Sequence, residues 1–234
     1  MNTPELPPFW ALIPAAGVGS RMAADRPKQY LEVAGKTIIE HSLACFLDHP
    51  QLLGVVVSLA LDDPYWPHLA CAAEPRLQRA EGGRERADSV LNGLLRLSEL
   101  GARDEDWVLV HDAARPNLAR SDLDLLLAEL ASDAVGGLLA VPARDTLKRA
   151  GPDGRVRETV DRATIWQAYT PQMFRLGELQ RALADALLAG VAITDEASAM
   201  EWAGHAPRLI EGRADNLKVT RPEDLLGLRR LWRV

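Results

Sequence analysis

This sequence of 234 residues has few cysteines and no pair of histidines at helix spacing. It has only two cysteines, Cys45 and Cys71, and Cys45 lies among apolar neighbours in a helical pattern. We therefore expect a buried, reduced thiol there and no disulfide bridge, as is usual in a reducing compartment. The five histidines lack the spacing that places two metal ligands on one helix face, which disfavours a zinc site.

An excess of basic charge and long apolar runs are also absent. The formal net charge of -6 disfavours a nucleic-acid partner, because proteins that bind a phosphate backbone concentrate basic residues on one surface. No stretch approaches the roughly 18 apolar residues of a membrane span. The segment 1–8 holds Glu5 and three prolines where a secretory signal has a basic and then an apolar part. These absences predict a cytoplasmic protein that binds neither nucleic acid nor membranes.

The sequence does have enough apolar residues for a full core. Hydrophobic residues make up 47% of the chain, which suits one large α/β domain over residues 1–234. Apolar, β-branched segments alternate with segments of helical periodicity, and this predicts a Rossmann-like, doubly wound, mostly parallel sheet. The expected strands are 9–14, 52–60, 77–80, 107–110, 134–141 and 209–210, and the expected helices include 37–47, one starting near 87, and 176–188.

Residues 143–169 differ from the rest of the chain. Polar and apolar residues alternate at 145–149 and 155–160, on either side of a Gly-Pro-Asp-Gly turn at 151–154. This pattern predicts a β-hairpin. A polar hairpin that leaves a compact sheet can hold two subunits together, so we expect a protruding arm for dimerisation within the domain.

Three segments have the composition of helix starts. Ser-Asp-Leu-Asp at 121–124 is typical of a capping box. Thr194 precedes an apolar helical pattern and is expected to be an N-cap. Pro222 suits the first turn of the last helix, which Thr220 would cap.

The segment after the first expected strand has the composition of an anion-binding loop. Gly17 and Gly19 let the backbone of a tight turn approach a phosphate closely at the carboxyl end of the strand. Arg21 and Lys28 add two cations, which favours a nucleoside triphosphate over an ordinary strand-to-helix turn. Met22 replaces the third glycine of a dinucleotide fingerprint, and no Gly-Lys-Ser/Thr follows, so an oxidoreductase and a P-loop kinase are both disfavoured.

Two aspartates are further candidate site residues, in addition to this predicted phosphate site. Asp112 follows the strand 107–110 at the edge where open α/β sheets bind ligands, and its oxygens suit Mg²⁺. Taken alone, Asp112 could equally cap its own turn. Asp215 and Lys218 lie in a charged loop near the C-terminus, and such loops are usually only solvated.

Taken together, the motifs resemble the 2-C-methyl-D-erythritol 4-phosphate cytidylyltransferase family of the non-mevalonate isoprenoid pathway. The resemblance covers residues 11–224 in collinear order, and the ensemble is specific although each motif alone is weak. The motifs are 14–22, Pro-Lys-Gln-Tyr at 27–30, Arg-Ala-Asp-Ser-Val at 86–90, His-Asp-Ala-Ala-Arg-Pro at 111–116, Asp-Arg at 161–162, Thr-Pro-Gln at 170–172, Thr-Asp-Glu-Ala-Ser at 194–198 and the segment 211–222.

The resemblance implies a reaction in which CTP, with Mg²⁺, gives its cytidylyl group to the phosphate of methylerythritol phosphate and releases pyrophosphate. The attacking phosphate is already largely ionised at neutral pH, since its second pKa is about 6, so no general base is required. The catalytic task is then charge neutralisation and in-line positioning.

The resemblance also implies site residues. Those assigned to catalysis are Arg21, Lys28, Lys218 and Arg162; to the nucleotide, Pro14, Ala15, Ala16, Gly17, Gly19, Gly82, Gly83, Ser89 and Ala113; to the acceptor, Arg115, Thr146, Arg162, Thr194 and Asp215; and to the metal, Asp112 and Asp215. Arg162 would reach the neighbouring subunit of a homodimer, whereas its sequence context alone indicates only a surface charge. The resemblance leaves open whether Asp215 binds the metal or the hydroxyl groups of the acceptor.

Two alternatives to this function remain. One is a cytidylyltransferase for another polyol phosphate, such as ribitol 5-phosphate, which would share the opening loop and differ on the acceptor side. The other is a nucleotide-binding regulator without catalysis, which could dispense with Lys28 and Lys218. The presence of both lysines disfavours the regulator.

Overall fold

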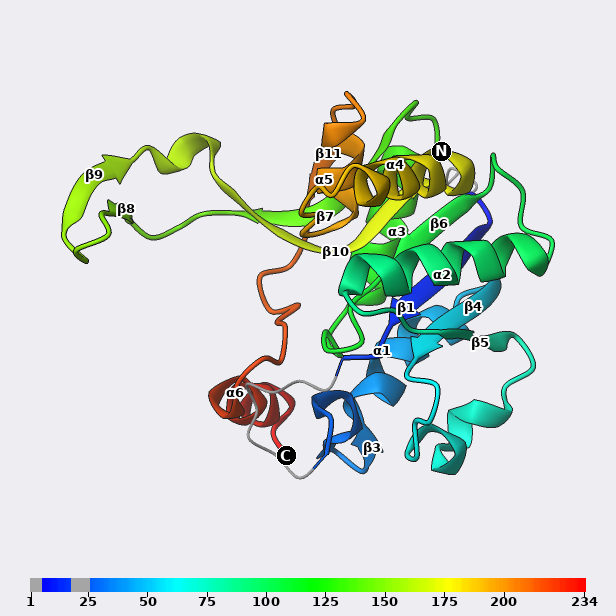
Figure 1. Ribbon diagram of the computed structural model, residues 1–234. Helices are drawn as coiled ribbons and strands as arrows, with labels where there is room; N and C mark the ends of the chain where they lie inside the picture. Colours follow the sequence, from blue (N-terminus) through cyan, green and yellow to red (C-terminus); the bar gives the residue numbers. More distant parts are fainter. Residues whose placement is uncertain (1–5, 18–25) are drawn as a thin grey trace, which may run out of the picture.

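A seven-stranded sheet forms the centre of the computed structural model, which describes residues 6–17 and 26–234 (Figure 1). The strand order is β11-β7-β10-β6-β1-β4-β5. Neighbouring strands are parallel except that β10 is antiparallel to both β6 and β7. The strands are β1 (Phe9–Pro14), β4 (Leu52–Leu59), β5 (Leu77–Glu81), β6 (Trp107–Val110), β7 (Gly136–Pro142), β10 (Trp166–Arg175) and β11 (Arg208–Glu211). The predicted α/β fold class is confirmed.

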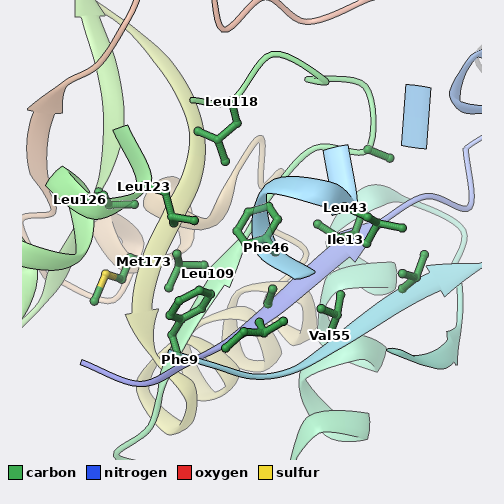
Figure 2. Close-up of a cluster of buried hydrophobic side chains, with 14 of the residues drawn as sticks. Phe9, Ile13, Leu43, Phe46, Val55, Leu109, Leu118, Leu123, Leu126 and Met173 are labelled. Carbon is green, nitrogen blue, oxygen red and sulfur yellow. The ribbon is translucent and has the colours of Figure 1, made fainter. Parts of the chain in front are cut away.

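Helices cover both faces of this sheet. Side chains of β1 alternate between two cores: Ile13 packs in the cluster that includes α1 and α3, and Leu12 packs in the cluster that includes α2, α4 and α5. Figure 2 shows the first cluster. In it the rings of Phe46 of α1 and Phe9 of β1 meet edge to face, with 6.4 Å between their centroids. The helices are α1 (Ile38–Leu47), α2 (Arg86–Glu99), α3 (Arg120–Leu130), α4 (Leu176–Leu188) and α5 (Glu196–Trp202).

Short elements complete the described part of the chain. The strands β2 (Glu32–Val33) and β3 (Lys36–Thr37) form a small hairpin whose turn residues both have positive φ, as a two-residue turn requires. The last helix, α6 (Pro222–Trp232), begins at the expected proline and packs Leu228 against this hairpin and α1. Four 3-10 helices are η2 (Lys28–Tyr30), η3 (Trp66–His68), η4 (Ala70–Ala73) and η5 (Arg162–Thr164).

The antiparallel strand β10 was not expected from the sequence. Pro171 lies within it, and proline usually argues against a central strand because it cannot donate a ladder hydrogen bond. The pairing of β10 with β7 shifts register between Ala168 and Gln172, so the ladder is interrupted around the proline. The strand therefore tolerates Pro171 at an irregularity in the middle of the sheet.

Three expected helix starts are wrong in detail. Helix α6 has Arg221 and not Thr220 as its N-cap, and the Thr220 hydroxyl donates to the Asp224 carboxylate at 2.7 Å. Helix α3 begins at Arg120 after Ala119 without a side-chain cap, so Ser121 lies inside the helix, and the Asp124 carboxylate pairs with Arg120 at 2.7 Å. Helix α5 is capped by Asp195, whose carboxylate accepts the N–H of Ser198 at 3.0 Å. Thr194 therefore precedes the N-cap.

The predicted hairpin is present as a separate two-stranded sheet. Strands β8 (Leu147–Ala150) and β9 (Val156–Val160) pair antiparallel and project far from the central sheet (Figure 1). Most of their side chains are exposed. The use of this arm in dimerisation, and the assignment of residues 1–234 to one domain, stay predictions.

Both cysteines are free thiols. Each is only partly buried, and burial raises the pKa of Cys45 and of Cys71 to about 11. Among the described residues, no helix is both long and apolar enough to cross a membrane.

Candidate active site

Two adjoining cavities lie beyond the carboxyl ends of β1 and β6, where α/β sheets bind ligands. We name each cavity after the predicted binding residues that line it. The nucleotide-side cavity has a volume of about 290 Å³ and the acceptor-side cavity about 280 Å³. Both are lined by Arg86, Asp112 and Lys218, which we call the wall. The structure thus places three charged side chains between two pockets of similar size.

The nucleotide-side cavity brings together most of the residues predicted to bind nucleotide. Gly82 is not among its lining residues, although a Cβ there would lie 2.1 Å from that of Ala16, so glycine is needed for the close approach of the two segments. Gly19 and Arg21 lie outside the described residues. The predicted residues that line this cavity are Pro14, Ala15, Ala16, Gly17, Lys28, Gly83, Ser89 and Ala113.

Hydrogen bonds hold the backbone that surrounds this cavity. Gln29 is buried, and its amide donates to the carbonyls of Ala15 at 2.7 Å and of Gly17 at 3.1 Å. The Ser89 hydroxyl accepts the N–H of Gly83 at 2.9 Å. The Ser58 hydroxyl in turn donates to the Ser89 carbonyl at 2.7 Å. These contacts hold the end of β1 to η2, the turn before α2 to that helix, and the start of α2 to β4.

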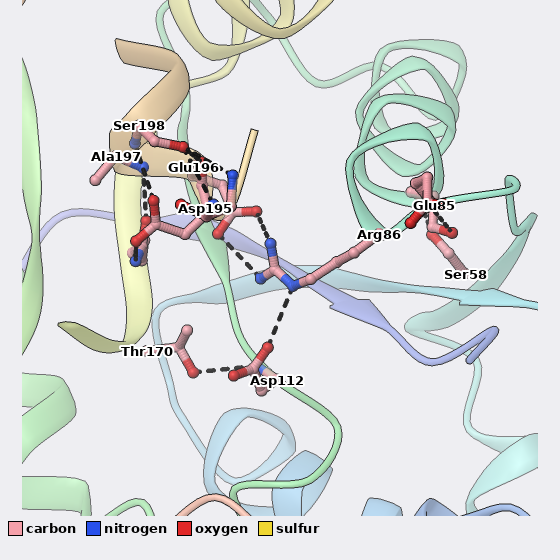
Figure 3. Close-up of polar contacts among 12 residues, drawn as sticks. Ser58, Glu85, Arg86, Asp112, Thr170, Asp195, Glu196, Ala197 and Ser198 are labelled. Carbon is pink, nitrogen blue, oxygen red and sulfur yellow. Dashed lines mark hydrogen bonds and ion pairs between the residues drawn. The ribbon is translucent and has the colours of Figure 1, made fainter. Parts of the chain in front are cut away.

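The wall is an ion-pair network centred on Asp112. Figure 3 shows the part of it in which Arg86 lies between Asp112 and Glu196. Oδ1 of Asp112 accepts from Arg86 Nε at 3.3 Å, while its Oδ2 lies 3.3 Å from Arg115 Nε and 2.8 Å from Lys218 Nζ. Arg86 also forms two hydrogen bonds to the Glu196 carboxylate, at 2.6 and 3.1 Å. Both oxygens of Asp112 are therefore engaged by cations of this chain.

The pKa values of Asp112 and Arg86 reflect two opposed effects, which are burial and the charges of the neighbouring side chains. Burial alone would raise the pKa of Asp112, but the charges of Arg86, Lys218 and Arg115 outweigh it and hold that pKa well below its usual range. Burial alone would lower the pKa of Arg86, but Glu196 and Asp112 raise it. Both groups are charged at neutral pH.

A buried histidine fixes the backbone of Asp112. Burial lowers the pKa of His111 to about 4, so its ring is neutral at pH 7. Its Nε2 lies 3.0 Å from the Arg115 carbonyl, which can only accept, so Nε2 carries the proton and Nδ1 accepts from the Thr170 hydroxyl at 2.9 Å. The Thr170 oxygen then accepts the N–H of Asp112 at 3.1 Å.

Three contacts place the segment that carries Lys218. Arg115 donates to the Asn216 carbonyl at 2.8 Å, and the Asn216 amide donates to the Thr170 carbonyl at 2.9 Å. The N–H of Val219 donates to the Ala114 carbonyl at 2.8 Å. The charged loop is therefore anchored to β10 and to the end of β6, which its sequence did not indicate.

The residues predicted to bind the acceptor are only partly brought together. Arg115 and Thr194 line the acceptor-side cavity. Asp215 lines neither cavity, and its carboxylate pairs with the guanidinium of Arg213. Thr146 and Arg162 are exposed on and beside the arm.

A metal site made from these carboxylates fits poorly. Each oxygen of Asp112 already has a cationic partner, and Asp215 has another. In the described part of the chain, no group of three or more His, Cys, Asp or Glu side chains is arranged to hold a metal ion. The metal-binding role of Asp112 and Asp215 stays a prediction.

Arg86 of the wall and its partner Glu196 are two residues for which the sequence predicted no role. Both lie within the quoted motifs, at the first residue of α2 and of α5 respectively. The available signal was the position of Arg86, because a cation at a helix N-terminus is disfavoured by the helix dipole and needs nearby carboxylates.

The fold and this site define a class of protein, the α/β nucleotidyltransferases. The model of one family within it, 2-C-methyl-D-erythritol 4-phosphate cytidylyltransferase (IspD), matches residues 9–229. The chain belongs to this family.

Relatives and solved structures that carry the name of this enzyme are similar to the chain over nearly its whole length. A 2-C-methyl-D-erythritol 4-phosphate cytidylyltransferase of Pseudomonas fluorescens strain SBW25 is 77% identical over 228 residues, 97% of each chain, and one of Pseudomonas aeruginosa is 75% identical over 230 residues, 98% of each. A crystal structure of 4-diphosphocytidyl-2C-methyl-D-erythritol synthase is 43% identical, with a TM-score of 0.83 over 97% of this chain and 99% of the other. The Francisella tularensis cytidylyltransferase is 34% identical, with a TM-score of 0.81 over 97% and 100%.

Proposed function

We propose that this protein transfers CMP from CTP to 2-C-methyl-D-erythritol 4-phosphate, giving 4-diphosphocytidyl-2-C-methyl-D-erythritol and pyrophosphate. The observation that carries the proposal is the pair of cavities that share Arg86, Asp112 and Lys218. A reaction that joins two phosphorylated substrates needs two adjoining pockets with positive charge between them. The family membership of the chain supports both substrates.

The nucleotide-side cavity takes CTP. Backbone groups around Ala15 and Gly83 are held by the buried side chains of Gln29 and Ser89, so they present a preformed surface to the base and ribose. Lys28 lines the same cavity and meets the triphosphate. Gly19 and Arg21 keep their proposed roles at the phosphates.

The acceptor-side cavity takes methylerythritol phosphate. A phosphate oxygen of the acceptor attacks the α-phosphorus of CTP in line, the new P–O bond forms, and the bond to the departing pyrophosphate breaks with its electron pair. Lys218 neutralises charge where the two phosphates meet, and Arg115 and Thr194 contact the acceptor. No side chain has to remove a proton, because the attacking phosphate is already ionised.

Mg²⁺ is proposed to arrive with CTP. It binds phosphate oxygens well, and it commonly retains water with few protein ligands. The cationic partners of Asp112 and Asp215 leave these residues poorly suited to hold it first, so we derive no step through a protein-held metal.

The arm is proposed to complete the site of a second copy in a homodimer. Arg162 and Thr146 lie on or beside a hairpin that projects from the sheet, and neither lines the nucleotide-side or the acceptor-side cavity. A crossing arm would bring both to the acceptor of the neighbouring subunit. A cytoplasmic location is part of the same proposal.

Release of pyrophosphate from CTP and Mg²⁺ tests this function. The acceptor panel is methylerythritol phosphate, ribitol 5-phosphate and a reaction without acceptor. We expect turnover well above both controls with methylerythritol phosphate alone. Equal rates with the two polyol phosphates would reject the proposed acceptor, and no release with any acceptor would favour a regulator.

A further inference from the structure

The carboxylate of Glu196 belongs to the wall network but faces neither substrate cavity. Glu196 is only 1% exposed and lines neither the nucleotide-side nor the acceptor-side cavity. Its two oxygens nevertheless accept two hydrogen bonds from Arg86, which lies 110 positions earlier in the chain and does line both cavities. A buried carboxylate with this single strong partner acts on the site only through that partner.

The position of Glu196 is fixed by the start of α5. Asp195 caps the helix, and the amide of Gln172 on β10 donates to Asp195 at 2.9 Å. The Gln172 oxygen also accepts the N–H of Ala197 at 2.8 Å. Contacts on both sides of Glu196 thus tie its backbone to the central sheet, and its carboxylate has little freedom to follow a moving arginine.

Arg86 depends on this carboxylate for its orientation. It is the first residue of α2, where the helix dipole disfavours a positive charge. The planar guanidinium presents its donors in a fixed fork, so two bonds to Glu196 set the plane of the group. The remaining Nε–H then points to Oδ1 of Asp112 (Figure 3).

We propose that Glu196 is a positioning residue for cytidylyl transfer, because by holding Arg86 it fixes Asp112 and thereby places Lys218 between the two cavities. Oδ1 of Asp112 is held by Arg86, which leaves Oδ2 directed at Arg115 Nε, 3.3 Å away, and at Lys218 Nζ, 2.8 Å away. The inference rests on the proposed function, since Lys218 is assigned there to the charge of the joined phosphates.

Steady-state kinetics of isosteric variants test this chain of contacts. Glu196→Gln keeps the shape but removes the charge and one acceptor of the pair. The matched control is Glu99→Gln, which breaks an Arg–Glu pair at 2.8 Å on the exposed end of the same helix, α2. The kcat and both KM values are measured with CTP and methylerythritol phosphate, alongside thermal unfolding by circular dichroism.

We expect Glu196→Gln to lower kcat about ten- to hundred-fold, as misplacement of a group at the reacting centre does, with a much smaller change in the KM for CTP. Glu99→Gln stays within about two-fold of the wild type. In an Asp112→Asn background, Glu196→Gln lowers kcat by less than about a further two-fold, because the effects of substitutions in one network are not additive.

A kcat for Glu196→Gln equal to that of Glu99→Gln would overturn the proposal. Full additivity with Asp112→Asn would overturn it too, because it would show that Glu196 does not act through Asp112. If Glu196→Gln does not fold, Arg86→Lys tests the contact between Arg86 and Glu196, because lysine keeps the positive charge but lacks the planar guanidinium that forms two hydrogen bonds. An unchanged kcat in Arg86→Lys would also overturn the proposal. If the wild type itself releases no pyrophosphate, the proposed function fails and not this inference.

Discussion

The wall and the arm are built in opposite ways, although both carry arginines assigned to the same reaction. Asp112 of the wall and the neighbouring Glu196 are buried, and the residues of their ion pairs come from α2, the segment after β6, α5 and the 213–219 loop. On the arm, the Arg149–Glu158 pair joins two strands of one hairpin, and its side chains are 64% and 57% exposed. The wall is preorganised by the fold of one chain, whereas the arm is organised only by itself. We therefore expect substitutions at the wall to act on chemistry within a subunit, and substitutions on the arm to act between subunits.

Loss of a lysine in the cavities should have the largest effect. Lys28→Ala and Lys218→Ala are each expected to lower kcat about 10²-fold or more, since each removes a charge that stabilises the transition state. Pyrophosphate release is the measurement. Lys36→Ala, at an exposed lysine of β3, is the control and should retain wild-type turnover. Near-normal turnover in a cavity variant would remove that lysine from the mechanism.

A mixture of variants tests whether the arm crosses to a second subunit. Arg162→Ala and Lys218→Ala are each expected to be poorly active alone. After subunit exchange of equal amounts, hybrid dimers contain one intact site, so activity should recover to about a quarter of the wild type. Exchange is verified by mass spectrometry of tagged chains. No recovery after verified exchange would place Arg162 in its own chain's site or outside catalysis.

The buried histidine beneath the wall predicts a dependence of stability on pH. The pKa of His111 is lowered by burial to about 4 in the folded protein, against about 6.5 when unfolded, so the unfolded chain binds more protons between these values. Stability should therefore fall as pH drops, by about 2 kcal/mol from this group between pH 7 and 5. The low pKa of Asp112 acts only below about pH 4.

Denaturant unfolding at pH 7, 6 and 5 measures this slope. In His111→Gln the loss between pH 7 and 5 should be smaller than in the wild type. The control is His68→Gln, the same change at an exposed histidine. An identical slope in wild type and His111→Gln would show that His111 is not the responsible group.

The exposed ion pair of the arm should matter least. Glu158→Gln is expected to change the free energy of unfolding by less than about 1 kcal/mol, because exposed pairs are well solvated. The same denaturant titration measures it, with Glu99→Gln as a second exposed pair for comparison. A loss several times larger would mean that the arm is not organised by itself alone.

The same contrast explains what the sequence could predict. Apolar runs such as 107–110 and the turn at 151–154 are local signals, and both elements were predicted. Strand β10 was missed because Pro171 interrupts its pattern, and the irregular pairing that accommodates the proline depends on β7.

The site shows the same limit. Asp112 was predicted to follow a strand at the ligand-binding edge of the sheet, and it lines both cavities there. Its ion-pair partners were not predictable, because Arg86 and Lys218 come from distant segments. The pairing of Glu196 with Arg86 depends on how α5 docks on β10, and no local pattern encodes it.

A crystal structure with a non-hydrolysable CTP analogue and Mg²⁺ tests the central claim most directly, namely that the wall separates nucleotide from acceptor. We predict the base and ribose beside Gly83 and Ser89, with the α-phosphate at the wall next to Lys218 and the acceptor-side cavity left open. A nucleotide base bound between Tyr169 and Thr194, on the other side of Asp112, would contradict the account.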